Sequence, residues 1–115
     1  TGMTESSGIF SFPSTGIYMV MCNAAMSVNN DNSATIDTYV TLDNSSYTSL
    51  ATAIDGNRDT TNTFASGSSI IFVDVTNISN VKIKFVTTSM AASSNAQGHT
   101  TLNLTYFTFV RMGDT

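Results

Sequence analysis

The segment from Leu102 to Val110 is apolar on both of its faces when it is read as a β-strand. Alternation along the strand places on one side Leu102, Leu104, Tyr106 and Val110, and on the other Phe107 and Phe109. A strand of a small antiparallel sandwich normally buries one face and exposes the other to water. Because 115 residues cannot supply a third layer, we expect another copy of the chain to cover the second face. The sequence therefore predicts an assembling β-sandwich rather than an enzyme.

The polar character of the chain comes mainly from uncharged residues. Charged residues make up 10% of the chain, against about 25% in ordinary soluble domains, whereas 46 of the 115 residues are Thr, Ser or Asn. Thr favours strands, and Ser and Asn favour turns, so the mixture predicts an all-β chain with many loops. A net charge of −4 with four basic residues argues against nucleic-acid binding. The apolar runs are far shorter than the ~18 residues that membrane insertion requires.

Apolar runs separated by turn residues predict seven or eight strands and no helix, as in a sandwich or jelly roll. The expected strands cover residues 9–12, 17–28, 35–43, 47–54, 69–75, 81–86 and 102–110, and the longest loops cover residues 29–33, 55–62 and 89–100. Gly16, after Pro13, is expected to adopt a positive φ at the end of a turn. We expect one domain over residues 1–115, with its core between about residues 8 and 112. Because no signal peptide precedes the first strand, we expect processing or a place at the end of a longer chain.

Alternation also predicts which side chains face the core. In the strand at residues 81–86, Val81, Ile83 and Phe85 are expected inside and the two lysines outside. In the strand at residues 35–43, one side is expected to carry Ile36, Val40 and Leu42, and the other Asp37, Tyr39 and Thr41. Cys22 lies within an apolar run, which indicates a buried, inert thiol rather than a nucleophile.

Three segments resemble the C1q-like domain family. Its signature of phenylalanine, turn and Gly-x-Tyr is similar to residues 10–20, FSFPSTGIYMV. The runs at residues 70–75 and 81–86 lie where that family has its E and F strands, and residues 105–110, TYFTFV, resemble its closing strand. The family's cysteines are absent, and Thr108 stands near its usual glycine. C1q-like and TNF-like jelly rolls also occur in phage tail-fibre tips and other virion proteins, whose ends are similar to the FVRMGDT at residues 109–115.

The resemblance implies a compact homotrimer in which the sheet that contains the first and last strands faces the threefold axis. The alternatives are another oligomer, or a monomer whose sheet edges curl over both strands. The candidate interface residues are Tyr18, Leu104, Tyr106, Phe107 and Phe109. One of the two sides of the final strand is expected to lie between chains.

Neither a catalytic site nor a resident cofactor is expected from the motifs. His99 is the one histidine, there is no Gly-x-Ser-x-Gly elbow, and one Cys with one His cannot form a zinc cage. Asp55, Asn57 and Asp59 have the spacing that begins a calcium loop, but Thr60 replaces the required glycine. We expect an ordinary turn there, with these three residues as weak calcium candidates.

Long polar loops are the expected place for a partner, because loops on a rigid sandwich carry recognition. The candidate ligand residues are Asn30, Asp31, Asn57, Arg58, Asp59, Gln97 and His99. Their amide, hydroxyl and carboxylate groups favour a host-surface glycan, and the alternative is that the loops are plain connections. The predicted function is that of a viral or phage structural domain. It would be the trimeric head of a tail fibre or a capsid-decorating protein, located on the virion among other virion proteins. The alternative is a secreted C1q-like recognition module of a cellular organism.

Overall fold

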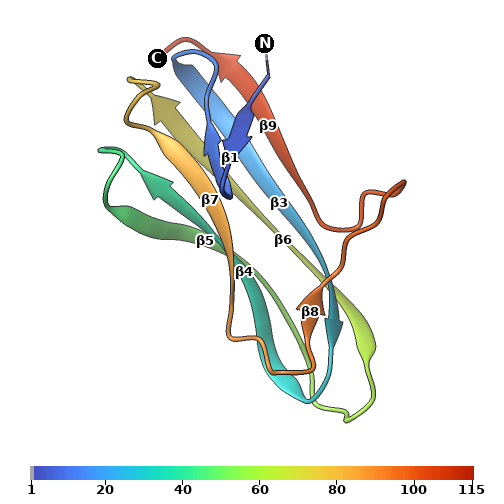
Figure 1. Cartoon of the computed structure of the whole chain (residues 1–115). Helices are drawn as coiled ribbons and strands as arrows, with labels where there is room; N and C mark the ends of the chain where they lie inside the picture. The colour runs from blue at the N-terminus through green and yellow to red at the C-terminus, as the bar shows by residue number, and fades with distance from the viewer. Residues whose placement is uncertain (1) are drawn as a thin grey trace.

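The computed structural model describes residues 2–115, which form two antiparallel sheets packed face to face (Figure 1). The strands are β1 (Thr4–Ser6), β2 (Ile9–Ser11), β3 (Gly16–Val28), β4 (Asp31–Thr41), β5 (Tyr47–Asn57), β6 (Thr63–Val75), β7 (Lys82–Thr88), β8 (Asn95–Ala96) and β9 (Tyr106–Gly113). One sheet has the order β1-β2-β7-β4-β5. In the other, β3 lies between β6 on one side and both β8 and β9 on the other. The expected all-β fold with two antiparallel sheets is confirmed.

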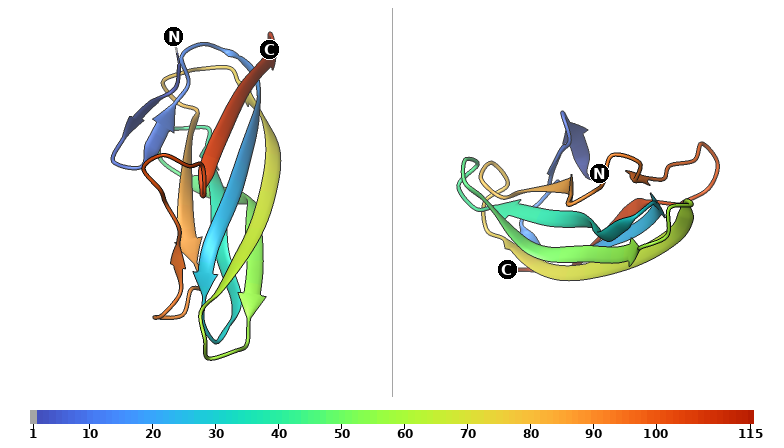
Figure 2. Two further views of the ribbon diagram at one scale, coloured as in Figure 1. Left: turned by 90° about the vertical axis from the view of Figure 1, so that its right-hand side faces the viewer. Right: turned by 90° about the horizontal axis from the view of Figure 1, so that it is seen from below.

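The two sheets curve around a shared interior, and the second one forms the convex outside of the molecule (Figure 2). Residues 2–115 contain no helix that is long and apolar enough to cross a membrane. The molecule is elongated, with extents of 47 × 31 × 22 Å. Its long axis follows the 13-residue strands β3 and β6, which pair along their whole length.

Aromatic rings from both sheets fill the centre of the sandwich. Phe85 of β7 stacks on Phe107 of β9 with 3.7 Å between ring centroids, and Phe10 of β2 lies 5.4 Å from Phe109. Phe85 contacts both of the buried clusters that make up the core. Val81 and Ile83 are buried, and Phe85 packs against the core, so the predicted alternation in this strand is confirmed.

The even-numbered residues of β3 face the interior and the odd-numbered ones face outward. Val20, Cys22 and Met26 are at most 1% exposed, whereas Met19 and Met21 are partly exposed. Burial raises the pKa of the Cys22 thiol to about 11, so this group is protonated at neutral pH. This agrees with the prediction of a buried, inert thiol.

Gly16 begins β3 with a φ of +144°, as the turn signal predicted. A Cβ atom at this position would lie 2.6 Å from the carbonyl oxygen of Gly113 and 2.7 Å from Nε of Arg111. The Nε–H of Arg111 donates to the carbonyl of Thr15 over 3.1 Å, which holds the turn against the end of β9. Glycine is therefore required both by the backbone conformation and by the close approach of β9.

The last strand is shorter at its beginning than predicted, because β9 starts at Tyr106 rather than Leu102. Thr105 explains the difference. Its Oγ1 accepts a hydrogen bond from the backbone N–H of Ala25 and donates to the carbonyl of the same residue, at 3.1 and 2.9 Å. A side chain thus replaces the ladder partner of β3 at this point. Leu102, which is 60% exposed, lies in a loop outside the sheet.

Several other predicted boundaries were wrong because turn chemistry was misread. The predicted loop at residues 29–33 is a two-residue turn, since Asn30 adopts a positive φ and β4 begins at Asp31. β4 ends at Thr41, so Leu42 is exposed rather than facing the core. Thr41, expected outside, is buried; its hydroxyl donates to the Asp43 carboxylate and accepts from the N–H of Ser45.

Two short strands were missed, and two middle strands are longer than predicted. β1 forms a hairpin with β2 through Ser7 and Gly8, both with positive φ, and β8 lies within the predicted loop at residues 89–100. β5 continues to Asn57 and β6 begins at Thr63, so the loop between them comprises residues 58–62.

Candidate functional site

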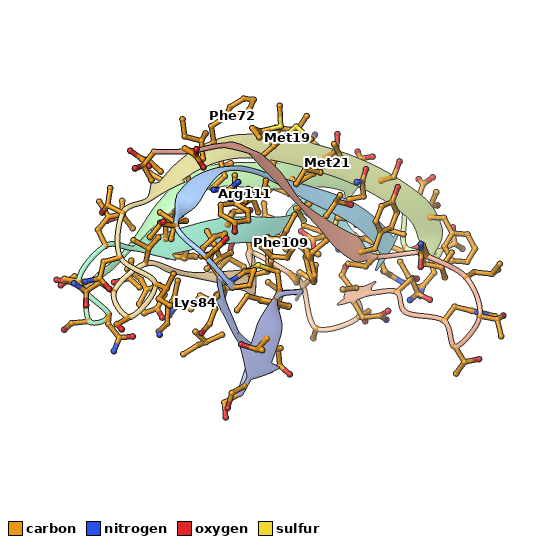
Figure 3. The ribbon with its side chains drawn as sticks, turned by 90° about the horizontal axis from the view of Figure 1, so that it is seen from above. Met19, Met21, Phe72, Lys84, Phe109 and Arg111 are labelled. Carbon is orange, nitrogen blue, oxygen red and sulfur yellow. The ribbon has the colours of Figure 1, made fainter. Side chains whose placement is uncertain are left out.

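The outward side of the β6-β3-β9 sheet carries a continuous group of apolar side chains, which we call the apolar face. It consists of Ile17, Met19, Met21, Ile70, Phe72 and Val110. The strand register brings them together, because Met19 pairs with both Phe72 and Val110, and Met21 pairs with Ile70. Figure 3 shows Met19, Met21 and Phe72 on the convex outside of the sheet, with Phe109 on the inner side.

The apolar face is exposed to a degree that is unusual for residues of these types. Phe72 is 64% and Ile70 is 53% exposed. Ile17 and Val110, at the two ends of the group, are 38% and 39% exposed. Exposed apolar side chains that are gathered on one face, rather than scattered singly, indicate an interaction surface.

Three predicted interface residues lie inside the chain's own sandwich. Tyr18 is 3% exposed, and its hydroxyl donates to the carbonyl of Ser14 over 3.1 Å. Phe107 and Phe109 pack against the two core clusters. These three side chains stabilise the monomer and do not reach the outer face. Of the predicted set, Tyr106 and the partly buried Leu104 remain accessible there.

The register shows why sequence reasoning could not tell the inward residues of this set from the outward ones. Both sides of β9 are apolar, and nothing in a single strand tells which side faces the partner sheet. The outward residues Ile70 and Phe72 of β6 lie in a continuous apolar run, which indicates burial on both faces. That signal could have directed attention to β6 as the neighbour of β3.

Two of the three predicted ligand loops meet at one end of the sandwich, in the lower part of Figure 1, and the beginning of the third joins them there, since the N–H of Asn29 donates to Oγ of Ser94 over 3.1 Å. The N–H of Asn30 donates to the carbonyl of Asp59 over 2.7 Å, and the amide of Asn29 donates to Oδ1 of Asn62 over the same distance. Asn57 donates its amide N–H to the carbonyls of Val28 and Thr61. These amides hold the loops together, and the Asn57 side chain, one of the predicted ligand groups, is already engaged within the chain.

Asp31 is buried and has a structural role, so it is not exposed to a ligand. It is 6% exposed, and its carboxylate accepts hydrogen bonds from the N–H of Ala91 at 2.7 Å and of Ser33 at 3.2 Å. The bond from Ala91, followed by that from Ser33, lowers the pKa of this carboxyl group. Asp31 thereby fastens the segment after β7 to the start of β4.

The weak calcium candidates do not form a cage. Oδ1 of Asn57 accepts the N–H of Asp59 over 2.9 Å, which is an ordinary Asx turn. The Asp55 carboxylate lies on β5 and accepts from the N–H groups of Gly56 and Ser66. Within residues 2–115, no group of three or more His, Cys, Asp or Glu side chains is placed to hold a metal ion. Arg58 is exposed in the same loop.

Gln97 and His99 lie away from the joined loops, in the segment between β8 and β9. The N–H of Gln97 donates to the carbonyl of Ala25 over 2.8 Å, which places it beside β3. Nδ1 of His99 accepts the N–H of Thr101 over 3.1 Å, and the ring is exposed. The seven candidate ligand residues therefore do not form one site.

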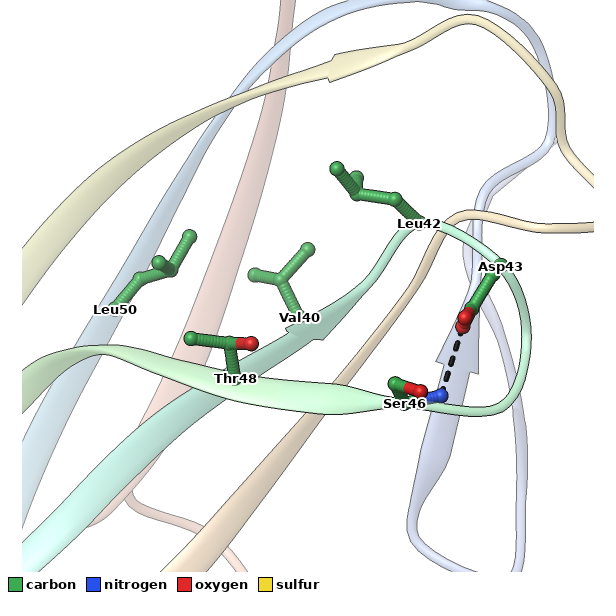
Figure 4. A pocket seen from close by; sticks show the side chains of 6 residues that line it. All are labelled: Val40, Leu42, Asp43, Ser46, Thr48 and Leu50. Atoms are coloured by element: carbon green, nitrogen blue, oxygen red, sulfur yellow. Dashed lines mark hydrogen bonds between the residues drawn. The ribbon is translucent and has the colours of Figure 1, made fainter.

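A separate hollow of about 400 Å³ lies on the inner side of the β4–β5 hairpin (Figure 4). Val40, Leu42 and Leu50 line it with apolar atoms. The Asp43 carboxylate beside it is engaged, because it accepts the N–H groups of Ser46 and Ser45 at 2.7 and 2.9 Å. These bonds lower the pKa of Asp43 to about 2.

The chain was compared with known proteins by sequence. No protein-family model matches it, and no curated protein matches it. Its class rests on the fold: an all-β protein of two antiparallel sheets packed as a sandwich.

Proposed function

We propose that this domain is a non-enzymatic structural module of a virion, the trimeric head of a tail fibre or a capsid-decorating protein, that assembles through its apolar face. The observation that carries the proposal is the outward row Phe72–Met19–Val110, apolar across three neighbouring strands. Burying such a row against copies of itself removes it from water, which stabilises an assembly. An interface between identical chains needs no other partner.

The strand order supports a jelly roll of the C1q-like and TNF-like kind. Four of the five strands of one sheet, β2-β7-β4-β5, face a sheet in which β3 lies between β6 and β9. The first long strand, β3, and the last strand, β9, are therefore neighbours, whereas the short first strands β1 and β2 belong to the other sheet. With the predicted virion location, this arrangement supports assembly and adhesion at a host surface as the proposed function of the domain.

The oligomeric state tests the assembly. Light scattering of the purified chain at micromolar concentration should give about three times 12.2 kDa. Phe72→Asp should give monomers with an unchanged circular dichroism spectrum, because the side chain lies outside the core. The matched control is Lys84→Asp on the outer side of the other sheet, which should remain trimeric. A native chain that stays monomeric at 100 micromolar would contradict the proposed assembly.

The virion assignment needs a different measurement. Antibodies to the chain, applied to particles of the parent virus, should label projections in electron micrographs. Label at fibre ends indicates a tail-fibre head, and label over the shell indicates a capsid-decorating protein. Recovery of the protein as a secreted product of a cellular organism would contradict the assignment and support the C1q-like recognition module.

A further inference from the structure

Beyond the apolar face, toward the end of β3, the same side of the sheet is hollowed and lined by smaller and more polar side chains. The register places Asn23 opposite Ser68, and Ala25 opposite Ser66, so small side chains replace the large ones of the apolar face. Two adjoining hollows, of about 380 and 300 Å³, share Ala25, Ser66 and Leu104 in their linings. The floor is therefore formed by β3 and β6.

The walls of this hollow come from loops and strand ends. Phe64 and Leu104 line one part and Tyr106 lines the other. Phe64 is 83% exposed, and the Tyr106 ring is 37% exposed. Gln97 adds a side-chain amide at the edge. Aromatic and aliphatic walls around a few hydrogen-bonding groups are the usual composition of a small-molecule site.

Asn23 is the unusual residue of the floor. Its Nδ2 atom is shielded from solvent and has no hydrogen-bond partner within residues 2–115. An unpaired, shielded amide is costly, and a bound hydroxyl group would satisfy it once the side chain turns toward the hollow. Rotation about the broad χ2 torsion of asparagine can turn either amide atom toward the hollow.

The charge of the side chains that line the hollow indicates which class of ligand it can bind. Among the described residues that line it, none is acidic or basic, and the polar groups are the amides of Asn23 and Gln97 and the hydroxyls of Ser66, Ser68 and Tyr106. Uncharged donors and acceptors fit hydroxyl groups and leave a carboxylate or phosphate without a counter-charge. A pyranose ring presents hydroxyls at its rim and apolar C–H faces that pack on aromatic rings.

We infer that this hollow is a binding site for a neutral, monosaccharide-sized sugar unit. The ring lies against Tyr106, Leu104 and Phe64, and its hydroxyls bond to Asn23 and the serines. The site is distinct from the loops that the sequence suggested, and it shares only Gln97 with them. It stands on the hollow, which contains none of the six residues of the apolar face, and does not depend on assembly.

The test follows the methyl NMR signals of Ala25 and Leu104 in the full chain during titration with D-glucose, D-galactose and N-acetyl-D-glucosamine. At least one of these sugars should cause saturable shifts with a Kd in the millimolar range, as expected for a ligand of so few atoms. D-glucuronate, which carries a charge, should bind at least tenfold more weakly than D-glucose.

Variants separate binding from folding. Asn23→Ala and Tyr106→Ala should each weaken binding at least tenfold, whereas Tyr47→Ala on the other sheet should not change it. Because the Asn23 amide has no partner in the described chain, Asn23→Ala should not lower the Tm, which keeps the test valid if Tyr106→Ala unfolds. Absence of saturable shifts with all three neutral sugars, or unchanged affinity in Asn23→Ala, overturns the inference. The molar mass of the same samples tests the proposed assembly independently.

Discussion

The outer sides of the two sheets differ in kind. On the β2-β7-β4-β5 sheet, Asp37 accepts hydrogen bonds from the hydroxyls of Thr52 and Thr88, and the ammonium of Lys84 lies 4.3 Å from the centre of the Tyr47 ring. On the β6-β3-β9 sheet, the corresponding surface is the apolar face (Figure 3). A polar outer side completes a sandwich that water can surround. The apolar one is the surface that the proposed assembly would cover.

The largest expected effect is the difference between substitutions on the inner and the outer side of β3. Val20→Asp places a charge in the core and should abolish folding, because an unpaired buried charge costs several kcal/mol. Met19→Asp, one residue earlier and on the outer side, should fold and remain monomeric. Circular dichroism and light scattering measure the two outcomes. If both variants unfold, the outer side belongs to the core of the single chain and the comparison fails.

Dilution should reveal whether the apolar face is covered. Association stabilises the folded state in proportion to the logarithm of concentration, so a hundredfold dilution should lower the Tm of the native chain by roughly 5 °C. Met19→Asp should show a Tm that is independent of concentration. A constant Tm for the native chain would indicate a stable monomer.

A smaller effect is expected on the polar side. Lys84→Ala removes the cation–π contacts with Tyr39 and Tyr47 and should lower the free energy of unfolding by about 0.5–1 kcal/mol. Urea unfolding measures this change. The molar mass should stay that of the native protein, since Lys84 lies away from the apolar face. A loss of assembly in this variant would place the interface on the other sheet.

The smallest expected effect is on the stability of the protein at acidic pH. The folded-state pKa of Asp43 is lowered from 3.8 to about 2, so its contribution to stability is present above pH 3.8 and is lost as the pH falls through 2. Asp43→Asn should therefore reduce the dependence of the Tm on pH between 4 and 2. The apolar face carries no titratable group among its six residues, although Asp74 of β6 pairs with Ile17 beside it.

The sequence was sufficient for the fold class because period-2 patterns such as Val81, Ile83 and Phe85 depend on the strand alone. Boundaries depended on contacts that no pattern contains, such as the Thr105 hydroxyl that ends the pairing of β9 beside Ala25. The sequence showed that both sides of β9 are apolar, but one strand alone could not show which side faces the interior. The hollow at Asn23 arises from register between β3 and β6, and pairing partners are absent from a linear sequence.

The position of β9 has a consequence for how the chain is made. β3 is central to its sheet, yet its partner β9 is the last strand to be synthesised, and Arg111 reaches back to Thr15 across 96 residues. Contacts of such separation slow folding, because a long loop must close before they form. A nascent chain would hold Phe10 and Phe85 without the rings of Phe107 and Phe109 that pack on them. Completion of the fold therefore waits until β9 has emerged from the ribosome, and chains truncated before β9 should aggregate.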